Sequence, residues 1–263
     1  MCREIKEEIN LSIEGYTGLI KVNHVYDSHA VTLHVFQVIL YTGKLKCIQV
    51  SEYNWVELSK LQDYQLPPAN QAIINALLLS DIHVITPEDF TASKIELLKI
   101  EKMILQGIDL LQIRIKEGYA EKIDEIINKI KSIDKSKRIK VIINSEIDKV
   151  NQYDLFGLHL KSNELIKIEK RPLDKKIIIG ASCHNEFEIE KANSLGLDYI
   201  FISPVKMTKC YKSDQLIGWE GFSSLVSLAN MPAYALGGLS IRDLDKAKLS
   251  GAKGVAMIKS IWD

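Results

Sequence analysis

One short run of the chain places polar side chains at every second position. Gln112, Arg114 and Lys116 alternate there with apolar residues. On a strand, this spacing directs all three side chains to one face. Polar groups that face the interior of a fold are costly unless they meet a ligand. The planar guanidinium of an arginine and the ammonium of a lysine together are well suited to binding a pyrophosphate. We interpret the three residues as part of a ligand-binding site. The alternative is that they form ion pairs with acidic neighbours on the outer rim of the fold.

Two other apolar runs end in residues that suit acid–base chemistry or anion binding. His184 lies two residues after Ser182 and is a candidate general acid or base near neutral pH. The alternative interpretation is that His184 only caps the helix that follows. Gly237 and Gly238 let backbone N–H groups approach an anion closely, although a glycine pair is also typical of a plain turn. His159 lies inside an apolar run, and we expect it to be a core histidine.

Short apolar runs alternate with amphipathic stretches from residue 81 onward. The expected strands are residues 82–86, 109–114, 139–143, 156–160, 176–181, 198–202, 233–236 and 253–257. The expected helices are residues 92–106, 121–133, 185–195, 219–229 and 240–250, with a weaker one around 162–170. Alternation of this kind indicates parallel βαβ units, and eight strands close a TIM (β/α)8 barrel. The alternative is an open doubly wound sheet. A barrel predicts an active site at the C-terminal strand ends, where the polar residues above stand.

Several motifs in this region carry a family resemblance. QIRIK, IINS, GLHL, IIGASCH, DYIFISPV, YALGGL and GAKGVAMI occur in this order. They resemble the thiamine-phosphate synthase family, including its TenI-type thiazole tautomerase branch, over residues 81–263. The resemblance implies a barrel that binds a thiazole phosphate. Such a barrel acts either as a synthase, which joins the thiazole phosphate to an aminopyrimidine methyl pyrophosphate, or as a thiazole tautomerase. A sensor that binds a thiamine precursor without turnover is the non-enzymatic alternative.

The resemblance also implies a role for each matching residue. Gln112, Arg114 and Lys116 would hold the pyrimidine pyrophosphate, Asn144 and Ser182 would contact substrate, and Gly237 and Gly238 would cradle the thiazole phosphate. His184 matches the histidine that moves protons in the TenI-type branch. Magnesium is the implied cofactor, with Glu164 as a ligand. Ser145 stands where the family has a metal-binding aspartate, which weakens the synthase interpretation and leaves the tautomerase less affected.

The first eighty residues have a different character. Glu4, Glu7 and Glu8 share one side of an expected helix. Clustered carboxylates repel one another unless a cation binds them, so they suggest a magnesium site. The alternative is an acidic helix face exposed to solvent. The segment resembles the second half of a MutT-type Nudix box, with Asn10 in place of a glycine. In that family, the position of Asn70 hydrogen-bonds an oxidised guanine base.

The Nudix resemblance is incomplete, because the first half of the box is absent. We therefore expect an incomplete α+β Nudix domain at residues 1–80, with little or no hydrolase activity, before an α/β TIM barrel at residues 81–263. An 8-oxo-dGTP diphosphatase is the alternative function if the missing half lies upstream.

Composition limits the function classes. Equal numbers of basic and acidic residues, 34 each, argue against a broad nucleic-acid surface. No apolar run approaches the ~20 residues of a membrane helix, and the N-terminus is charged from its third residue, unlike a signal peptide. The four cysteines form no CxxC pair. We expect a cytoplasmic protein whose partners are small-molecule phosphates rather than nucleic acid or membrane, with a homo-oligomer left open.

Overall fold

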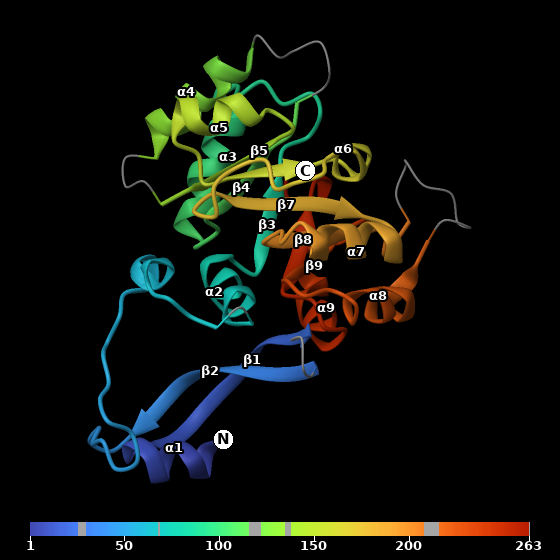
Figure 1. Cartoon of the computed structure of the whole chain (residues 1–263). Helices are drawn as coiled ribbons and strands as arrows, with labels where there is room; N and C mark the ends of the chain where they lie inside the picture. The colour runs from blue at the N-terminus through green and yellow to red at the C-terminus, as the bar shows by residue number, and fades with distance from the viewer. Residues whose placement is uncertain (26–29, 68, 116–121, 135–137, 208–215, 263) are drawn as a thin grey trace. The chain divides into compact units, whose positions relative to one another are not determined.

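A computed structural model describes residues 1–25, 30–67, 69–115, 122–134, 138–207 and 216–262 (Figure 1). The chain divides into two compact units, Met1–Leu78 and Leu79–Asp263. Within the described residues, no helix combines the length and the apolar character needed to cross a membrane.

Eight parallel strands of the second unit close into a barrel, which confirms the predicted barrel over an open sheet. They are β3 (Ile82–Ile85), β4 (Leu110–Ile113), β5 (Lys140–Asn144), β6 (Gly157–Leu160), β7 (Ile178–Cys183), β8 (Tyr199–Ile202), β9 (Ala233–Ala235) and β10 (Gly254–Met257). Each pairs with the next in chain order, and β10 pairs with β3 to complete the ring. The strands are buried along almost their whole length, as expected of a parallel sheet covered on its outer face.

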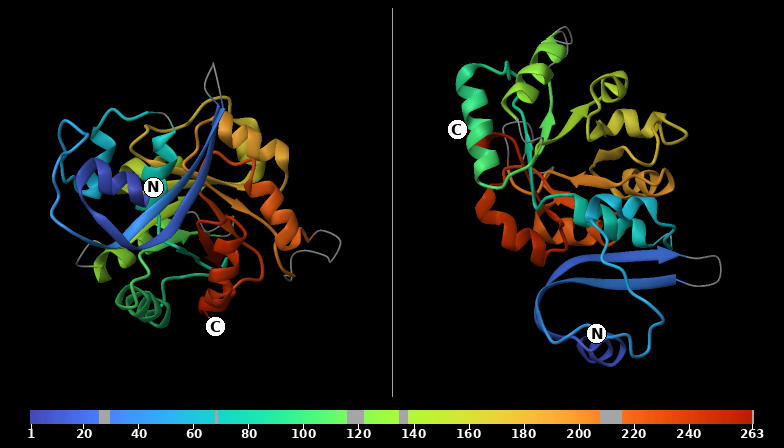
Figure 2. Two further views of the ribbon diagram at one scale, coloured as in Figure 1. Left: turned by 90° about the horizontal axis from the view of Figure 1, so that it is seen from below. Right: turned by 90° about the vertical axis from the view of Figure 1, so that its left-hand side faces the viewer.

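Helices follow the strands and cover the barrel from outside (Figure 2). They are α3 (Lys94–Leu105), α4 (Ile123–Ile133), α5 (Ile147–Tyr153), α6 (Ser162–Lys167), α7 (Glu186–Ser194), α8 (Gly218–Val226), η4 (Ile241–Asp243), α9 (Leu244–Leu249) and α10 (Lys259–Trp262). Helix α5 was not predicted, because this seven-residue helix buries only Val150 and has no apolar stripe.

Aromatic side chains fill the barrel interior. Tyr199, Phe201 and Tyr234 are completely or almost completely buried there. Room for them comes from Gly180 on β7, where an added Cβ would lie 2.1 Å from the ring of Tyr199. A glycine is therefore required at this position for steric reasons, because displacing either the backbone or the packed ring would cost free energy.

His83 on β3 lies among these rings with no exposed surface. Its ring centroid is 4.8 to 5.4 Å from those of Tyr199, Phe201 and Tyr234. Neither ring nitrogen has a hydrogen-bond partner among the described residues. Burial, and to a lesser degree His159, lowers the pKa of His83 well below its usual value, so the folded barrel keeps the ring neutral.

Acid should therefore destabilise the barrel through His83. The unfolded chain protonates this residue below about pH 6.5, whereas the folded barrel does not, so stability is full above that pH and falls as the pH drops. We expect His83→Leu to weaken the decline in unfolding free energy between pH 7 and pH 5 by up to about 1.4 kcal/mol per pH unit. Urea denaturation of both proteins measures it, and an identical pH dependence would contradict the prediction.

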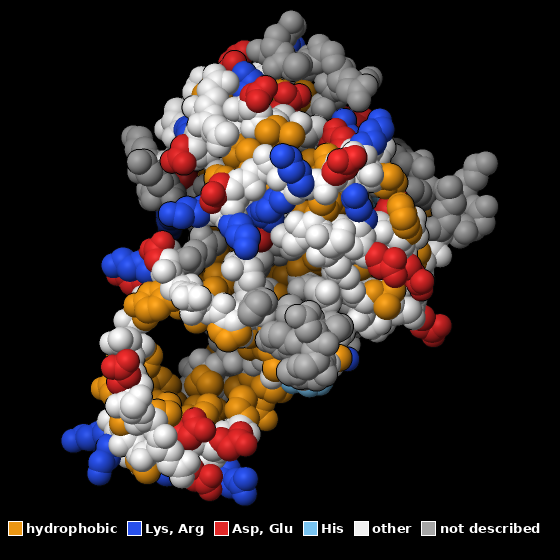
Figure 3. Space-filling view, in the orientation of Figure 1, with side chains coloured by type: hydrophobic (Ala, Val, Ile, Leu, Met, Phe, Trp, Pro, Cys, Tyr) orange, Lys and Arg blue, Asp and Glu red, His pale blue; other side chains and the backbone are white. Residues whose placement is uncertain are grey.

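The first unit contains α1 (Cys2–Ile9), β1 (Ser12–Val25), β2 (Ala30–Thr42), η1 (Leu58–Asp63) and α2 (Asn70–Leu78). The two long strands pair as an antiparallel ribbon, and α1 buries none of its residues. Exposed apolar side chains on this unit include Tyr16, Phe36, Ile39, Leu40 and Trp55. On the face that Figure 3 presents, orange side chains lie among charged ones. The Nudix interpretation of residues 1–80 stays a prediction.

Candidate active site

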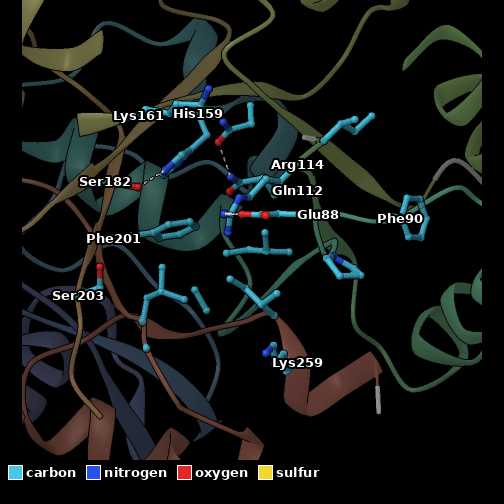
Figure 4. A pocket seen from close by; sticks show the side chains of 18 of the residues that line it. Glu88, Phe90, Gln112, Arg114, His159, Lys161, Ser182, Phe201, Ser203 and Lys259 are labelled. Carbon is cyan, nitrogen blue, oxygen red and sulfur yellow. Dashed lines mark hydrogen bonds and ion pairs between the residues drawn. The ribbon is translucent and has the colours of Figure 1, made fainter. Parts of the chain in front are cut away.

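A cavity of about 1620 Å³ opens at the C-terminal ends of the barrel strands (Figure 4). Seven of the predicted site residues line it: Gln112, Arg114, Asn144, Ser182, His184, Gly237 and Gly238. Residues far apart in the sequence thus meet at the end of the barrel where the fold places active sites. Lys116 lies outside the described residues. The chemical role of each residue stays a prediction.

Gln112 lines the cavity with a side chain that is almost completely buried, at 2% exposure. Its Nε2 donates to Asn144 Oδ1 at 3.0 Å, and Asn144 Nδ2 donates to Ser145 Oγ at 3.1 Å. These bonds fix the orientation of the Gln112 amide. Its Oε1 is buried and accepts no hydrogen bond from the described residues. This oxygen is therefore available to accept from an amino group of a ligand.

Arg114 stands at the end of β4 with its backbone tied to Thr86. Thr86 Oγ1 accepts from Arg114 N at 2.8 Å and donates to Arg114 O at 2.9 Å. The guanidinium pairs with Glu88, in the loop after β3, and both side chains are substantially exposed. An exposed pair of this kind is worth about 1 kcal/mol or less, so an anionic ligand can compete for the arginine.

His159 connects the aromatic interior with the cavity. Its Nδ1 is 2.9 Å from Tyr199 Oη and its Nε2 is 2.9 Å from Ser182 Oγ. Burial, followed by the charge of Arg114, lowers the pKa of His159 to about 3, so the ring is neutral at pH 7. The expectation of a core histidine is confirmed by its 1% exposure, yet His159 also holds a cavity hydroxyl. That contact depends on the pairing of β6 with β7, which sequence periodicity does not reveal.

His184 is held by the peptide backbone at the end of β7. Its Nδ1 is 2.9 Å from the carbonyl oxygen of Ser203, so in the neutral ring Nδ1 carries the hydrogen and donates it. Glu188 Oε2 accepts from the backbone N–H of His184 at 2.6 Å. The helix-cap alternative for His184 is wrong, because the N-cap of α7 is Asn185, whose side chain accepts from Glu188 N.

Glu164 serves as a local structural acceptor. Its Oε2 accepts from Ser145 Oγ and from the backbone N–H of Lys161, both at 2.9 Å, at the start of α6. Across the described residues, no three His, Cys, Asp or Glu side chains are grouped to hold a metal ion. Magnesium at phosphate-binding sites is held by one or two carboxylates together with substrate phosphates, and Glu164, the one carboxylate predicted for the barrel, is already engaged in two hydrogen bonds. No chemical step is therefore assigned to a metal.

The remaining predicted residues belong to the first unit. Glu4 pairs with the amine of Met1 at 3.0 Å, and Glu7 lies 3.8 Å from Arg3. The structure does not arrange Glu4, Glu7 and Glu8 as a ligand set. Asn70 begins α2 and is half-buried.

Gly237 and Gly238 follow β9 in a tightly packed loop. Their φ angles are +105° and +63°, a region that other residues rarely adopt. An added Cβ at Gly237 would lie 2.9 Å from Pro204 Cα, and one at Gly238 would lie 2.5 Å from the carbonyl oxygen of Met207. The loop brings bare backbone to the cavity wall, which suits close approach of an anion.

Five charged residues to which the sequence motifs assigned no role also line the cavity. They are Glu88, Asp89, Lys122, Lys161 and Lys259, all in the segments that follow barrel strands. The rule that strand ends carry the site would have found them if it had been extended into the loops.

Known proteins match the chain over the barrel. The thiamine monophosphate synthase family model matches residues 82–261. The chain belongs to this family. A thiamine-phosphate synthase of Pelotomaculum thermopropionicum is 29% identical over 190 residues, covering 72% of this chain and 87% of that protein. One of Prochlorococcus marinus is 33% identical over 168 residues, which are 63% of this chain and 49% of that one.

A solved structure shares the fold. The thiamine phosphate pyrophosphorylase of Pyrococcus furiosus superposes with a TM-score of 0.56 at 20% identity, covering 73% of this chain and 91% of that one. The predicted resemblance of the barrel to thiamine-phosphate synthases is confirmed. The thiamine monophosphate synthase family match begins at residue 82, so the Nudix hypothesis gains no support from it.

The serine at position 145 offers a test of the metal site in this family member. Ser145 has a φ of +69°, which aspartate and asparagine tolerate well. In Ser145→Asp a second carboxylate would face Glu164, and the repulsion between them would be relieved by a divalent cation. We expect magnesium to raise the Tm of Ser145→Asp by about 3 °C or more. Ser145→Asn is the neutral control, and an equal shift in both variants would contradict the prediction.

Proposed function

We propose that the barrel joins an aminopyrimidine methyl pyrophosphate to a thiazole phosphate and releases pyrophosphate, forming thiamine phosphate. The observation that carries the proposal is a single cavity lined both by Arg114, at the end of β4, and by the loop at Gly237 and Gly238, here called the glycine loop. Two anionic substrates need two separate anion sites. Membership of the thiamine monophosphate synthase family supports the same reaction.

The proposed reaction needs only one bond to break and one to form. The bond between the methylene carbon and the pyrophosphate oxygen breaks, and its electron pair leaves with pyrophosphate. The thiazole nitrogen then supplies the pair that forms the new C–N bond. Arg114, together with Lys116, would stabilise the charge on the leaving group, which a fork of N–H donors does well.

The remaining cavity residues would bind and orient the substrates. Gln112 Oε1 would accept from the amino group of the pyrimidine, because Asn144 already fixes the other end of the amide. Ser182, held by His159, would contact the reacting centre. The loop at Gly237 and Gly238 would bind the thiazole phosphate.

A second candidate is the thiazole tautomerase reaction, and His184 carries it. The imidazole lines the cavity, and its ring is oriented by the Ser203 carbonyl. Its Nε2 is then the nitrogen that would take up and return a proton. The reaction needs no metal, so the replacement of a metal ligand by Ser145 does not affect it.

The test is an assay of purified protein with both substrates, with and without magnesium, followed by detection of thiamine phosphate. Product would establish the synthase, and its absence would overturn the proposal. Tautomerisation of a thiazole phosphate without thiamine phosphate would select the second candidate, and an unchanged rate in His184→Ala would then remove the proton-transfer role. Saturable binding with neither reaction would indicate a sensor.

A further inference from the structure

Lys259 lies at the glycine-loop end of the cavity and has no role in the proposal above. It begins α10 directly after β10 and lines the cavity with Gly237 and Gly238. Strand β10 pairs with β9, so the segments that follow these two strands leave the barrel as neighbours. Ser260 Oγ donates to the carbonyl oxygen of Leu239 at 2.8 Å, which ties the first residues of α10 to the glycine loop.

The ammonium of Lys259 is uncompensated in the described part of the chain, where it has neither an ion pair nor a hydrogen bond. Other cations near the site are engaged. Lys206, whose backbone N–H donates to Gly237 O at 3.0 Å, pairs through its ammonium with Asp243 at 2.5 Å. Arg114 pairs with Glu88.

The position of Lys259 separates it from the other cationic groups of the cavity. In the view of Figure 4 it lies on the side opposite Lys161 and His159, on the helix that enters from below. Apart from the cationic groups on that side, the cavity therefore has a positive charge at Lys259, on the helix that is tied to the glycine loop. A free ammonium next to accessible backbone is the arrangement that stabilises a dianionic group, because the backbone supplies short hydrogen bonds and the lysine supplies the full charge.

We propose that Lys259 binds the phosphate of a phosphomonoester seated against the loop at Gly237 and Gly238. The lysine thereby makes this end of the cavity select the phosphorylated ligand over the corresponding alcohol. The identity of that ligand as a thiazole phosphate rests on the proposed function. The role of the ammonium does not, because it follows from the position and the uncompensated charge of the side chain.

The test compares Lys259→Ala with the wild-type protein. The variant is expected to raise the KM for thiazole phosphate about tenfold, the effect of losing one charge-assisted hydrogen bond at an accessible site. The preference for thiazole phosphate over the unphosphorylated thiazole alcohol, as a ratio of kcat/KM values, should fall by about the same factor. The KM for the pyrimidine pyrophosphate should stay within about twofold, because that substrate binds at the other end.

Two further variants control for charge and for folding. Lys259→Arg keeps the positive charge and should retain most of the selectivity. Lys102→Ala removes an exposed lysine from α3, outside the cavity, and should change none of the constants. An unchanged preference for phosphate in Lys259→Ala, or an equal loss for phosphate and alcohol, would overturn the proposal.

A binding experiment separates this inference from the proposed function. If the wild-type protein forms no thiamine phosphate, the proposed function fails, and calorimetric titration with inorganic phosphate then tests Lys259 alone. Binding that weakens about tenfold in Lys259→Ala but not in Lys102→Ala would support the anion site. Equal binding by both variants, or no binding by the wild-type protein, would overturn it.

Discussion

Arg114→Ala is expected to lower the kcat/KM for thiamine phosphate formation by about 10³-fold, the largest effect of any single substitution in the cavity. The leaving pyrophosphate gains charge as its bond to carbon breaks, and the guanidinium at the end of β4 is placed to stabilise it. The substitution should leave the strand end intact, because only backbone atoms of Arg114 bond to Thr86. Steady-state kinetics measure the loss, and circular dichroism checks the fold.

Glu88→Gln is the matched variant for this experiment, and it should act in the opposite direction. It removes the carboxylate that pairs with Arg114 while keeping the size of the side chain. A freed guanidinium should lower the KM for the pyrimidine pyrophosphate, by at most about fivefold because the pair is exposed. If Arg114→Ala and Glu88→Gln both reduced kcat/KM to a similar extent, the ion pair itself would be the requirement, and pyrophosphate binding by Arg114 would be contradicted.

Gly238→Ala is expected to lower the kcat/KM for thiazole phosphate by about 100-fold. A Cβ at this position would lie 2.5 Å from the carbonyl oxygen of Met207 and 3.0 Å from Lys206 Cβ. The loop must shift to accommodate it, and a displacement of about 1 Å is enough to misplace a bound phosphate. We also expect a loss of unfolding free energy of about 3 kcal/mol from left-handed strain together with crowding. Kinetics and urea denaturation measure the two effects.

Gly196→Ala provides a control with nearly the same backbone conformation. The φ angles of Gly238 and Gly196 are +63° and +60°, but an added Cβ at Gly196 would have no atom of the described residues within 4 Å, apart from its own chain neighbours. This variant should lose only the left-handed strain, about 1 kcal/mol, and keep its kcat/KM. The comparison therefore isolates crowding at the loop. Equal activity in the two variants would show that the glycine loop does not position the substrate.

The barrel was predictable because its determinants are local in the sequence. The strands are short apolar runs, most of them rich in branched residues, and α4 shows its apolar stripe at Ile123, Ile126, Ile127 and Ile130. Eight such strands in alternation with helices leave few arrangements that bury them all, and closure into a ring is one of these. The rule for parallel barrels then placed Gln112, Arg114 and Gly238 at one end without any knowledge of contacts.

The chain sequence by itself thus determined the architecture and the end of the barrel that holds the cavity, because period and strand order are properties of neighbouring residues. Only the tertiary structure decided which side chains touch. Three features bring together residues from different strand ends. They are the contact of His159 with Ser182, the pairing of Arg114 with Glu88, and the position of Lys259 beside the glycine loop. Such contacts depend on strand register and loop packing, which form only when the ring closes and which leave no periodic trace in the sequence.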